Sequence, residues 1–134
     1  MEKIFIDATN TQIGRIATFT VKQTLRGNKV FVLNSAQGII SGNKKDIIEK
    51  WRRRRAMGGS ALKGPYHSKD PEKILKRTIR GMLPNYRSGR GRVAWKNIKC
   101  HNEVPEEYSK EKITTLKIRL PKKYIQLKEL KEKL

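Results

Sequence analysis

The sequence has a single cysteine, Cys100, and no Asn-x-Ser/Thr glycosylation sequon among its 134 residues. A lone thiol cannot form an intramolecular disulfide, and rare cysteine suits a reducing compartment. Its longest apolar run, Val30 to Leu33, is far shorter than the roughly 20 residues of a membrane-spanning helix. The N-terminal residues lack the long apolar run of a signal peptide. We therefore expect a cytoplasmic protein.

Acidic residues are also scarce, and they are scarcest in one segment. The chain has 32 Lys and Arg against 12 Asp and Glu, a formal charge of +20. The segment from Trp51 to Lys99 holds fifteen of the cations and only two acids, Asp70 and Glu72. Like charge at this density opposes the compact state unless an anion neutralises it. The composition therefore indicates a protein that binds a polyanion, with RNA as the first candidate and DNA as the second.

Several other partners are disfavoured by what the basic segment lacks. It is interrupted by Gly and Pro and is poor in Trp, Phe and Leu, whereas helices that lie on membranes need such residues on one face. His67 and His101, with one cysteine, offer no zinc-ligand spacing. Adjacent Cys100 and His101 would point to opposite faces of a strand, so they do not form a nucleophile and base. We expect no catalytic residue, no metal, no cofactor, no membrane partner and no small-molecule substrate.

The loop from Asn34 to Lys45 contains two glycines after an apolar strand, a position that phosphate-binding loops also occupy. Only three residues separate Gly38 from Gly42, and Lys44 is followed by lysine rather than Ser or Thr, so it does not match a P-loop. We predict instead that Asn43 caps a helix, whose N-terminus with its lysines suits a phosphate of RNA.

The N-terminal half predicts an α/β fold. Lys3 to Asp7 is short, apolar and β-prone, and Ile13 to Leu25 has apolar residues at helical spacing. Gly27 is placed to end that helix, and Val30 to Leu33 follows as a second strand. Strand, helix and strand in this order favour a parallel sheet with a right-handed crossover.

Two helices are expected in the basic segment and around it. One helix starts at Asn43, includes Trp51 and continues into Arg52 to Arg55. We expect Trp51 to pack in the core, in preference to stacking on a base. Successive helical residues turn by about 100°, so the four arginines project all round the helix end. The other starts at Asp70-Pro71 and ends near Leu83. Its wheel separates an apolar half from a basic arc formed by Lys73, Lys76, Arg77 and Arg80.

The remaining segments carry weaker signals. Ala56 to Lys69 is rich in glycine and predicts a loop or an extended arm that RNA orders, together with the arginines before it. Asn85 to Arg92 predicts a flexible Gly/Arg loop, and Ile98 to His101 another strand. Asn102 to Ser109 is acidic, with Glu103, Glu106 and Glu107, and predicts an exposed loop. Leu127, Leu130 and Leu134 indicate a thin terminal helix that frays unless a partner holds it.

Three motifs carry a family resemblance that runs from about residue 3 to residue 101. They are Asp7-Ala8 with Ile13-Gly14-Arg15-Ile16-Ala17, Val32-Leu33-Asn34-Ser35 with Ser41-Gly42-Asn43-Lys44, and Ile79-Arg80-Gly81-Met82-Leu83-Pro84 with Gly89-Arg90-Gly91. In this order and spacing, the chain resembles the universal large-subunit ribosomal protein L13 family in its archaeal/eukaryotic form. The resemblance implies a three-layer α/β/α fold with a small, mainly parallel sheet of about four strands and basic extensions.

The resemblance also implies a non-enzymatic role as a structural constituent of the large ribosomal subunit. It would bind ribosomal RNA, assist subunit assembly and touch neighbouring ribosomal proteins. We expect residues 1–101 to form one RNA-binding domain, with a basic arm at 52–69 and the Gly/Arg loop at 85–92, and residues 102–134 to form a C-terminal extension with a terminal helix. The predicted RNA-binding residues are Asn43, Lys44, Lys45, Arg52, Arg53, Arg54, Arg55, Lys63, Tyr66, His67, Lys69, Lys76, Arg77, Arg80, Arg87, Arg90, Arg92 and Lys96.

Two other functions remain open on the residues alone. A DNA-binding or chromatin protein, or another ribonucleoprotein, would share the charge, although no helix-turn-helix or zinc module is evident. An RNA-modifying or nucleotide-using enzyme would need a matched acid and base, and Asp7 is the only acid beside a strand end. Binding to duplex DNA against structured RNA separates the first from the ribosomal reading, and dialysis against ATP or S-adenosylmethionine tests the second.

Overall fold

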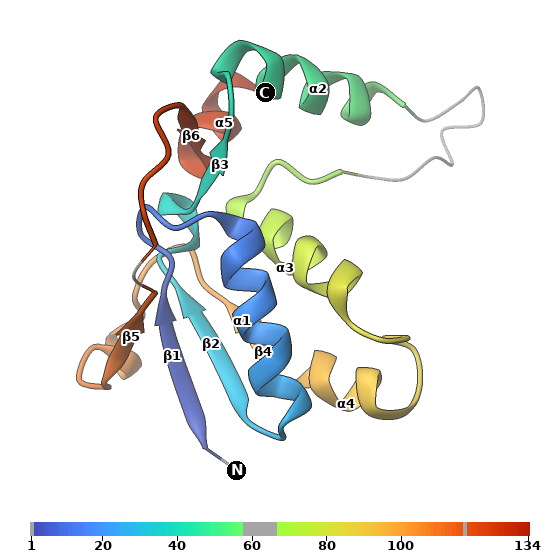
Figure 1. Cartoon of the computed structure of the whole chain (residues 1–134), viewed down its shortest axis with the longest axis vertical. Helices are drawn as coiled ribbons and strands as arrows, with labels where there is room; N and C mark the ends of the chain where they lie inside the picture. Colours follow the sequence, from blue (N-terminus) through green and yellow to red (C-terminus); the bar gives the residue numbers. More distant parts are fainter. Residues whose placement is uncertain (1, 58–66, 117) are drawn as a thin grey trace.

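Four short parallel strands form the central sheet, in the order β4-β2-β1-β5 (Figure 1). The computed structural model describes residues 2–57, 67–116 and 118–134. A separate antiparallel pair joins β3 to β6. The strands are β1 (Lys3–Asp7), β2 (Lys29–Leu33), β3 (Ile39–Ser41), β4 (Ile98–Cys100), β5 (Ile113–Thr115) and β6 (Tyr124–Gln126).

Five α-helices accompany these strands within the part of the chain that the structure describes. They are α1 (Ile13–Leu25), α2 (Lys44–Ala56), α3 (Pro71–Met82), α4 (Gly89–Lys96) and α5 (Leu127–Lys133). Two single-turn 3₁₀ helices, η1 (Ser35–Gln37) and η2 (Glu106–Tyr108), lie in the connections. The α/β class and the four-stranded parallel sheet are thus confirmed. None of the described helices is long and apolar enough to cross a membrane.

The β1-α1-β2 unit forms where the sequence predicts it. β1 pairs with β2 in parallel from Lys3–Lys29 to Asp7–Leu33. α1 ends in a Schellman motif: the Gly27 N–H donates to the Thr24 carbonyl and the Asn28 N–H to the Gln23 carbonyl. Gly27 adopts a φ of 95°, which glycine reaches at little cost. The predicted stop residue therefore ends the helix for the predicted reason.

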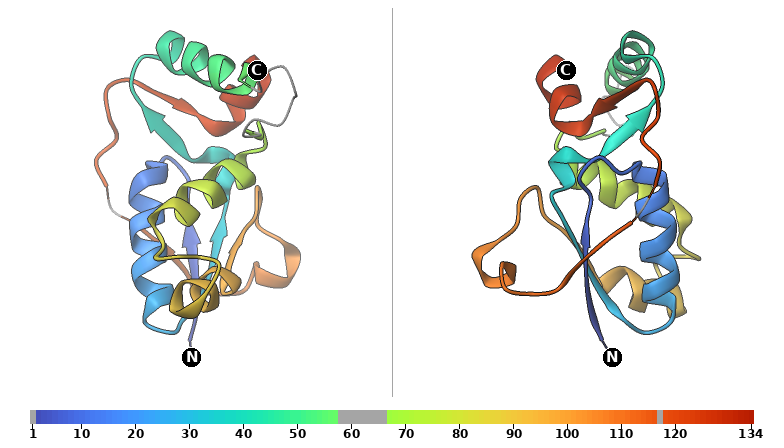
Figure 2. Two further views of the ribbon diagram at one scale, coloured as in Figure 1. Left: turned by 90° about the vertical axis from the view of Figure 1, so that its right-hand side faces the viewer. Right: turned by 60° about the vertical axis from the view of Figure 1, so that its left-hand side comes forward.

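The two faces of the central sheet carry different covers. On one face Ile6, Val30 and Val32 pack with Leu75 and Ile79 of α3 and with apolar residues of α1. Helices α1, α3 and α4 lie on this side (Figure 2). Burying each such Ile or Leu stabilises the fold by about 1.5–3 kcal/mol before the loss of entropy. This face holds the main core and fixes the position of α3.

The opposite face is covered by the segment around η2, which lies on the other side of the sheet from the helices (Figure 2). Phe5 and Phe31 stack with ring centroids 5.0 Å apart, and Tyr108 tilts against both. The predicted exposed loop after Asn102 is exposed at its glutamates, but Val104 and Tyr108 pack on the sheet. The third layer here is one 3₁₀ turn and its flanking chain.

The β3-β6 pair corrects two expectations. The predicted loop from Asn34 to Lys45 contains both η1 and β3, because β3 finds its partner more than 80 residues later in the chain. The terminal helix is docked on its own chain and needs no partner to hold it. Leu127 and Leu130 of α5 are fully buried and pack with Ile125 of β6 and Ile74 of α3. Residues 102–134 therefore contribute strands to both sheets. The domain division near residue 102 stays a prediction.

Candidate nucleic-acid interface

Helix α3 presents its basic arc from a fixed base. Asp70 occupies the N-cap position and Pro71 the first helical position, as predicted. Ile74, Leu75 and Ile79 are at most 3% exposed and anchor the helix on the core. Met82, placed in the apolar half by the helical wheel, is 44% exposed instead. Because the apolar side is buried, the basic side of α3 faces outward as a rigid surface.

A basic groove runs along this side of α3. Its first part, a hollow of ≈ 220 Å³, lies among the end of α2, His67, α3 and Trp95 of α4. A second hollow of ≈ 470 Å³ continues from α3 toward Lys96 and β4. Lys73, Lys76 and Trp95 line both hollows. We call the two hollows together the α3 groove.

The aromatic rings of the α3 groove and of its border each lie beside a cation. Lys76 Nζ lies 4.8 Å from the centroid of the Trp95 ring, and Arg54 Cζ lies 5.7 Å from that of Trp51. The Tyr86 ring has the guanidinium groups of Arg80 and Arg87 at 5.0 and 5.4 Å. These are cation–π distances. They hold long basic side chains beside α3 without using an acid.

Tyr86 and Arg87 are joined by a hydrogen bond as well. The Arg87 Nε donates to the Tyr86 hydroxyl at 3.2 Å. This bond, followed by the charges of Arg87 and Arg80, lowers the pKa of the phenol below its ordinary value. The predicted residues Arg80 and Arg87 therefore meet at one ring, although one lies on α3 and the other in the following turn.

Few acids neutralise these cations. Among the described residues, Lys73, Lys76 and Arg80 form no ion pair. Two ion pairs lie elsewhere: Lys44 pairs with Glu129 at 3.2 Å and Arg53 with Glu49 at 3.6 Å. The α3 groove therefore keeps its positive charge available to an anionic ligand.

The four arginines of α2 make more contacts within the chain than the sequence predicts. Arg52 Nη2 donates to the Lys133 carbonyl at 2.8 Å, and Arg55 Nε donates to the His67 carbonyl at 3.1 Å. Arg53 pairs with Glu49, and half-buried Arg54 lies over Trp51. Trp51 itself is partly buried against the small core of Ile74, Ile125, Leu127 and Leu130. This agrees with its predicted role as a core residue. These arginines are part of an ordered helix, contrary to the expectation that RNA alone orders them.

His67 lies between the two basic helices. The rings of His67 and Trp51 are nearly perpendicular, at 89°, with their centroids 6.3 Å apart. Desolvation, followed by the charges of Arg77 and Arg54, lowers the pKa of His67 below its ordinary value. The lowered pKa favours the neutral form of the imidazole. Of the other arm residues, Lys69 is exposed, and Lys63 and Tyr66 lie outside the described residues.

The prediction of a flexible Gly/Arg loop over Asn85 to Arg92 is wrong from Gly89 onward. Helix α4 begins at Gly89, so Arg90 and Arg92 stand exposed on a helix, and Lys96 lines the second hollow. A Cβ built on Gly91 would clash with the carbonyl oxygens of Pro84 and Asn85. Gly91 thus serves close backbone packing and not flexibility, and Ala94 is buried beneath the helix.

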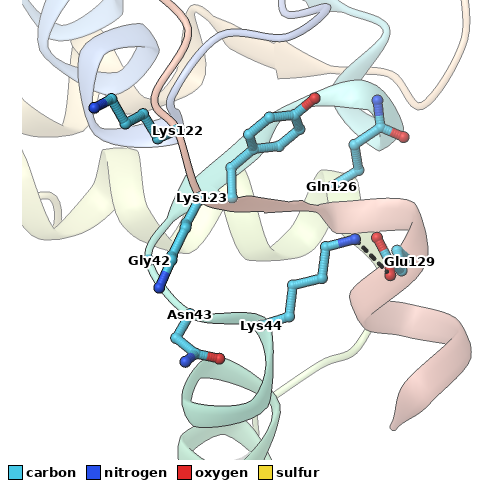
Figure 3. Close-up of a pocket in the computed structure, with 8 residues that line it drawn as sticks. Gly42, Asn43, Lys44, Lys122, Lys123, Gln126 and Glu129 are labelled. Atoms are coloured by element: carbon cyan, nitrogen blue, oxygen red, sulfur yellow. Dashed lines mark hydrogen bonds and ion pairs between the residues drawn. The ribbon is translucent and has the colours of Figure 1, made fainter.

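Another basic hollow, separate from the α3 groove, lies at the N-terminus of α2 (Figure 3). Asn43 caps the helix as predicted, its Oδ1 accepting the Lys45 N–H at 3.0 Å. Lys44 leans toward Glu129 of α5, and Lys122 and Lys123 contribute further positive charge from the segment before β6. Along α2, Lys44 of this hollow and Trp51 of the α3 groove are seven residues apart, a rise of about 10 Å.

Sequence reasoning missed several residues of these surfaces. Trp95 and Tyr86 carry no motif that marks them, and only their cation contacts show that they belong to the groove. Lys73 and Lys99 lay within the basic segment but outside the predicted binding set, and both line the groove. Lys122 and Lys123 approach the α2 N-terminus only through the β3-β6 pairing, which no local signal shows. Of these residues, the helical wheel places only Lys73, in the basic arc of the predicted helix.

Asp7 and Cys100, the residues considered above as an acid and a nucleophile, have structural surroundings. Burial tends to raise the pKa of Asp7, but hydrogen bonds from the Thr9 hydroxyl, the Thr9 N–H and Asn34 outweigh it, so the pKa lies below its ordinary value. Burial raises the pKa of the Cys100 thiol to about 12, in keeping with a packing role. No group of three or more His, Cys, Asp or Glu among the described residues is placed to hold a metal ion.

The chain matches known proteins over most of its length. The family model described as Ribosomal protein L13 matches residues 1–107. A large ribosomal subunit protein uL13 of Thermoplasma volcanium is 42% identical over 81% of this chain and 78% of its own length. Proteins with the same description from Methanosarcina barkeri and Natronomonas pharaonis are each 36% identical, over 96% and 98% of this chain and 95% and 90% of their own lengths.

These matches confirm the resemblance carried by the three sequence motifs, including its archaeal form. They also confirm the prediction of a non-enzymatic structural protein, a prediction that composition alone could not make. The family match ends at residue 107, so β5, β6 and α5 lie beyond it. By its motifs, its fold and its relatives, the chain belongs to the ribosomal protein L13 family.

Proposed function

We propose that this structural protein of the large ribosomal subunit binds ribosomal RNA through the α3 groove and assists the folding of that RNA during subunit assembly. One observation carries the proposal. Lys73, Lys76 and Arg80 of α3 pair with no described acid, and they lie on a helix whose opposite side is buried. A rigid row of charge follows a phosphate backbone without losing side-chain and backbone freedom on binding.

The contacts in this proposal are mainly to phosphates and to RNA shape. Arg and Lys on a fixed helix position the protein on the backbone and carry little sequence information. The exposed Arg90 and Arg92 of α4 and the arginines of α2 border the groove and extend the positive surface around it. The hollow at the α2 N-terminus adds lysines at a helix end, where an anion is also stabilised. Neighbouring ribosomal proteins would meet the remaining surface.

The test is a salt titration of binding by the full chain, with large-subunit ribosomal RNA and with duplex DNA of equal length. Each phosphate contact contributes a slope of about −0.7 to −0.9 in log affinity against log salt. With about eight contacts, we expect a slope near −6 to −7 for the RNA and weaker binding to the DNA at moderate salt. A slope near zero, or equal affinity for DNA, contradicts the proposal.

A second measurement addresses the ribosomal role directly. In a cell lysate fractionated by sedimentation at high salt, the protein should travel with the large subunit, because an assembly-stage component is held by many contacts at once. Recovery only in the light fractions, together with binding to duplex DNA, would favour the chromatin-type alternative.

A further inference from the structure

Trp95 stands between the two hollows of the α3 groove. It is half-buried on α4 and lines both the ≈ 220 Å³ hollow beside Trp51 and His67 and the ≈ 470 Å³ hollow beside Lys96. An indole that lines both hollows offers ring surface to a ligand in the groove. Lys73 and Lys76 line the same two hollows, so the ring surface and the positive charge occur together.

Six of the described aromatic residues fall into two sets with different surroundings. Phe5, Phe31 and Tyr108 stack on one another against the sheet, beside Leu33 and Val104. Trp51, Tyr86 and Trp95 lie half-buried on the other side of the molecule, each with a cation over its ring. The first set packs a core. The second set combines partly exposed rings with cations, as proteins that bind single-stranded nucleic acid do.

We propose that the α3 groove binds an unpaired RNA nucleotide, with its base stacked on Trp95 and its phosphate neutralised by Lys73 and Lys76. The inference rests on the proposed RNA binding and adds the kind of RNA that the groove selects. A duplex hides the faces of its bases, so only an unpaired or extruded base reaches the indole. Lys76 Nζ lies over the ring, 4.8 Å from its centroid. A base that stacks on that face displaces the ammonium, and the flexible lysine stem lets it move to the phosphate of that nucleotide.

A purely structural role for Trp95 makes a different prediction. In that case Lys76 and Trp95 only fasten α4 to α3, and replacing the ring alters folding stability without changing the preference between RNA forms. The experiment must therefore report on the ring itself and on single strands relative to duplexes. Because Trp51 and Trp95 are the two tryptophans of the chain, the Trp51→Phe variant leaves Trp95 as the sole source of tryptophan fluorescence.

The test titrates the full-chain Trp51→Phe variant with a mixed-sequence 12-nucleotide RNA, single-stranded or annealed to its complement. We expect the single strand to quench Trp95 emission and the duplex to leave it nearly unchanged. The Trp95→Phe variant, which leaves Trp51, should show much weaker quenching. An unchanged Trp95 signal at saturating single strand overturns the proposal, and this readout requires no change at Trp95.

Affinities supply the second readout. Stacking of one base contributes roughly 5- to 150-fold to affinity, so Trp95→Leu should weaken single-strand binding by about that factor, and Trp95→Phe by less. Duplex binding should change by less than about twofold, and circular dichroism checks the fold of each variant. Equal weakening for both RNA forms overturns the stacking proposal alone. Loss of salt-dependent RNA binding by the unmodified chain overturns the proposed function as well.

Discussion

The two basic helices differ in how they hold their charge. On α2, Arg52 and Arg55 donate to backbone carbonyls and Arg53 pairs with Glu49. On α3, Lys73, Lys76 and Arg80 pair with no described acid, and Lys76 and Arg80 lie over aromatic rings. The sequence has its densest charge on α2, but three of the arginines there already hold partners within the chain. Charge density along a sequence and charge offered to a ligand are therefore separate quantities.

The two helices also differ in anchorage. α3 buries Ile74, Leu75 and Ile79, whereas α2, all of whose residues the structure describes, has no buried side chain. α2 instead leans through partly buried Ile47, Ile48 and Trp51 on a small core built with β6 and α5. We expect α3 to be as stable as the main sheet and α2 to open more readily.

The largest expected effects come from removing the anchor of each helix. Leu75→Ala and Leu130→Ala each delete a fully buried leucine and should each cost about 2–5 kcal/mol in the free energy of unfolding. In hydrogen exchange, Leu130→Ala should speed exchange in α2, β3, β6 and α5 while sparing the central strands. Leu75→Ala should speed exchange throughout the central sheet. If Leu130→Ala left α2 protection unchanged, the difference in anchorage would be refuted.

A smaller effect is expected at the contact that places α4 beside α3. Gly91→Ala sets a methyl group against the backbone of Pro84 and Asn85 and should cost about 1–3 kcal/mol in urea unfolding. Gly81→Ala is the matched control, because no atom lies within 4 Å of its added Cβ. In helix α3 that change should stabilise by up to about 1 kcal/mol. Equal effects of the two substitutions would show that Gly91 is not a packing residue.

The smallest effect concerns His67, where the two basic helices meet. Desolvation and the charges of Arg77 and Arg54 lower its pKa, so the unfolded chain takes up a proton more readily than the folded one. Its contribution to stability therefore falls as pH drops below the ordinary histidine pKa of about 6.5. An NMR titration should place the His67 pKa below that value, and Arg54→Gln should raise it.

The control for this titration is Lys110→Gln, which removes an equal charge from the exposed segment after η2. It should leave the His67 pKa unchanged, because that segment covers the opposite face of the sheet. A His67 pKa at or above the ordinary value would mean that the basic helices do not act on this ring.

Local patterns were sufficient for the elements that fold around their own amphipathic faces. β1, α1 and α3 lie within one residue of their predicted bounds, because alternation, helical spacing and caps are written into each segment. The Asp70-Pro71 start and the Gly27 stop are of the same kind. The basic arc of α3 could be derived from the helical wheel for the same reason.

Contacts between distant segments could not be read in this way. β3 depends on β6, α4 depends on the packing of Gly91 against the chain before it, and Trp95 gains its meaning only from Lys76 across two helices. The arginines of α2 looked free because their carbonyl partners, in His67 and Lys133, lie far away in the sequence or across a loop. The sequence thus predicted that the site consists of basic residues, but it did not predict which of them lie together or which contacts they make.

The most direct test removes three charges from each helix in turn. Lys73→Gln/Lys76→Gln/Arg80→Gln is compared with Arg52→Gln/Arg53→Gln/Arg55→Gln, by salt titration of binding to large-subunit ribosomal RNA, with circular dichroism to check folding. The α3 variant should have a slope shallower by about 2–3, one contact per cation, and the α2 variant a slope shallower by about 1 or less. An equal or larger loss for the α2 variant would contradict the assignment of RNA binding to the α3 groove.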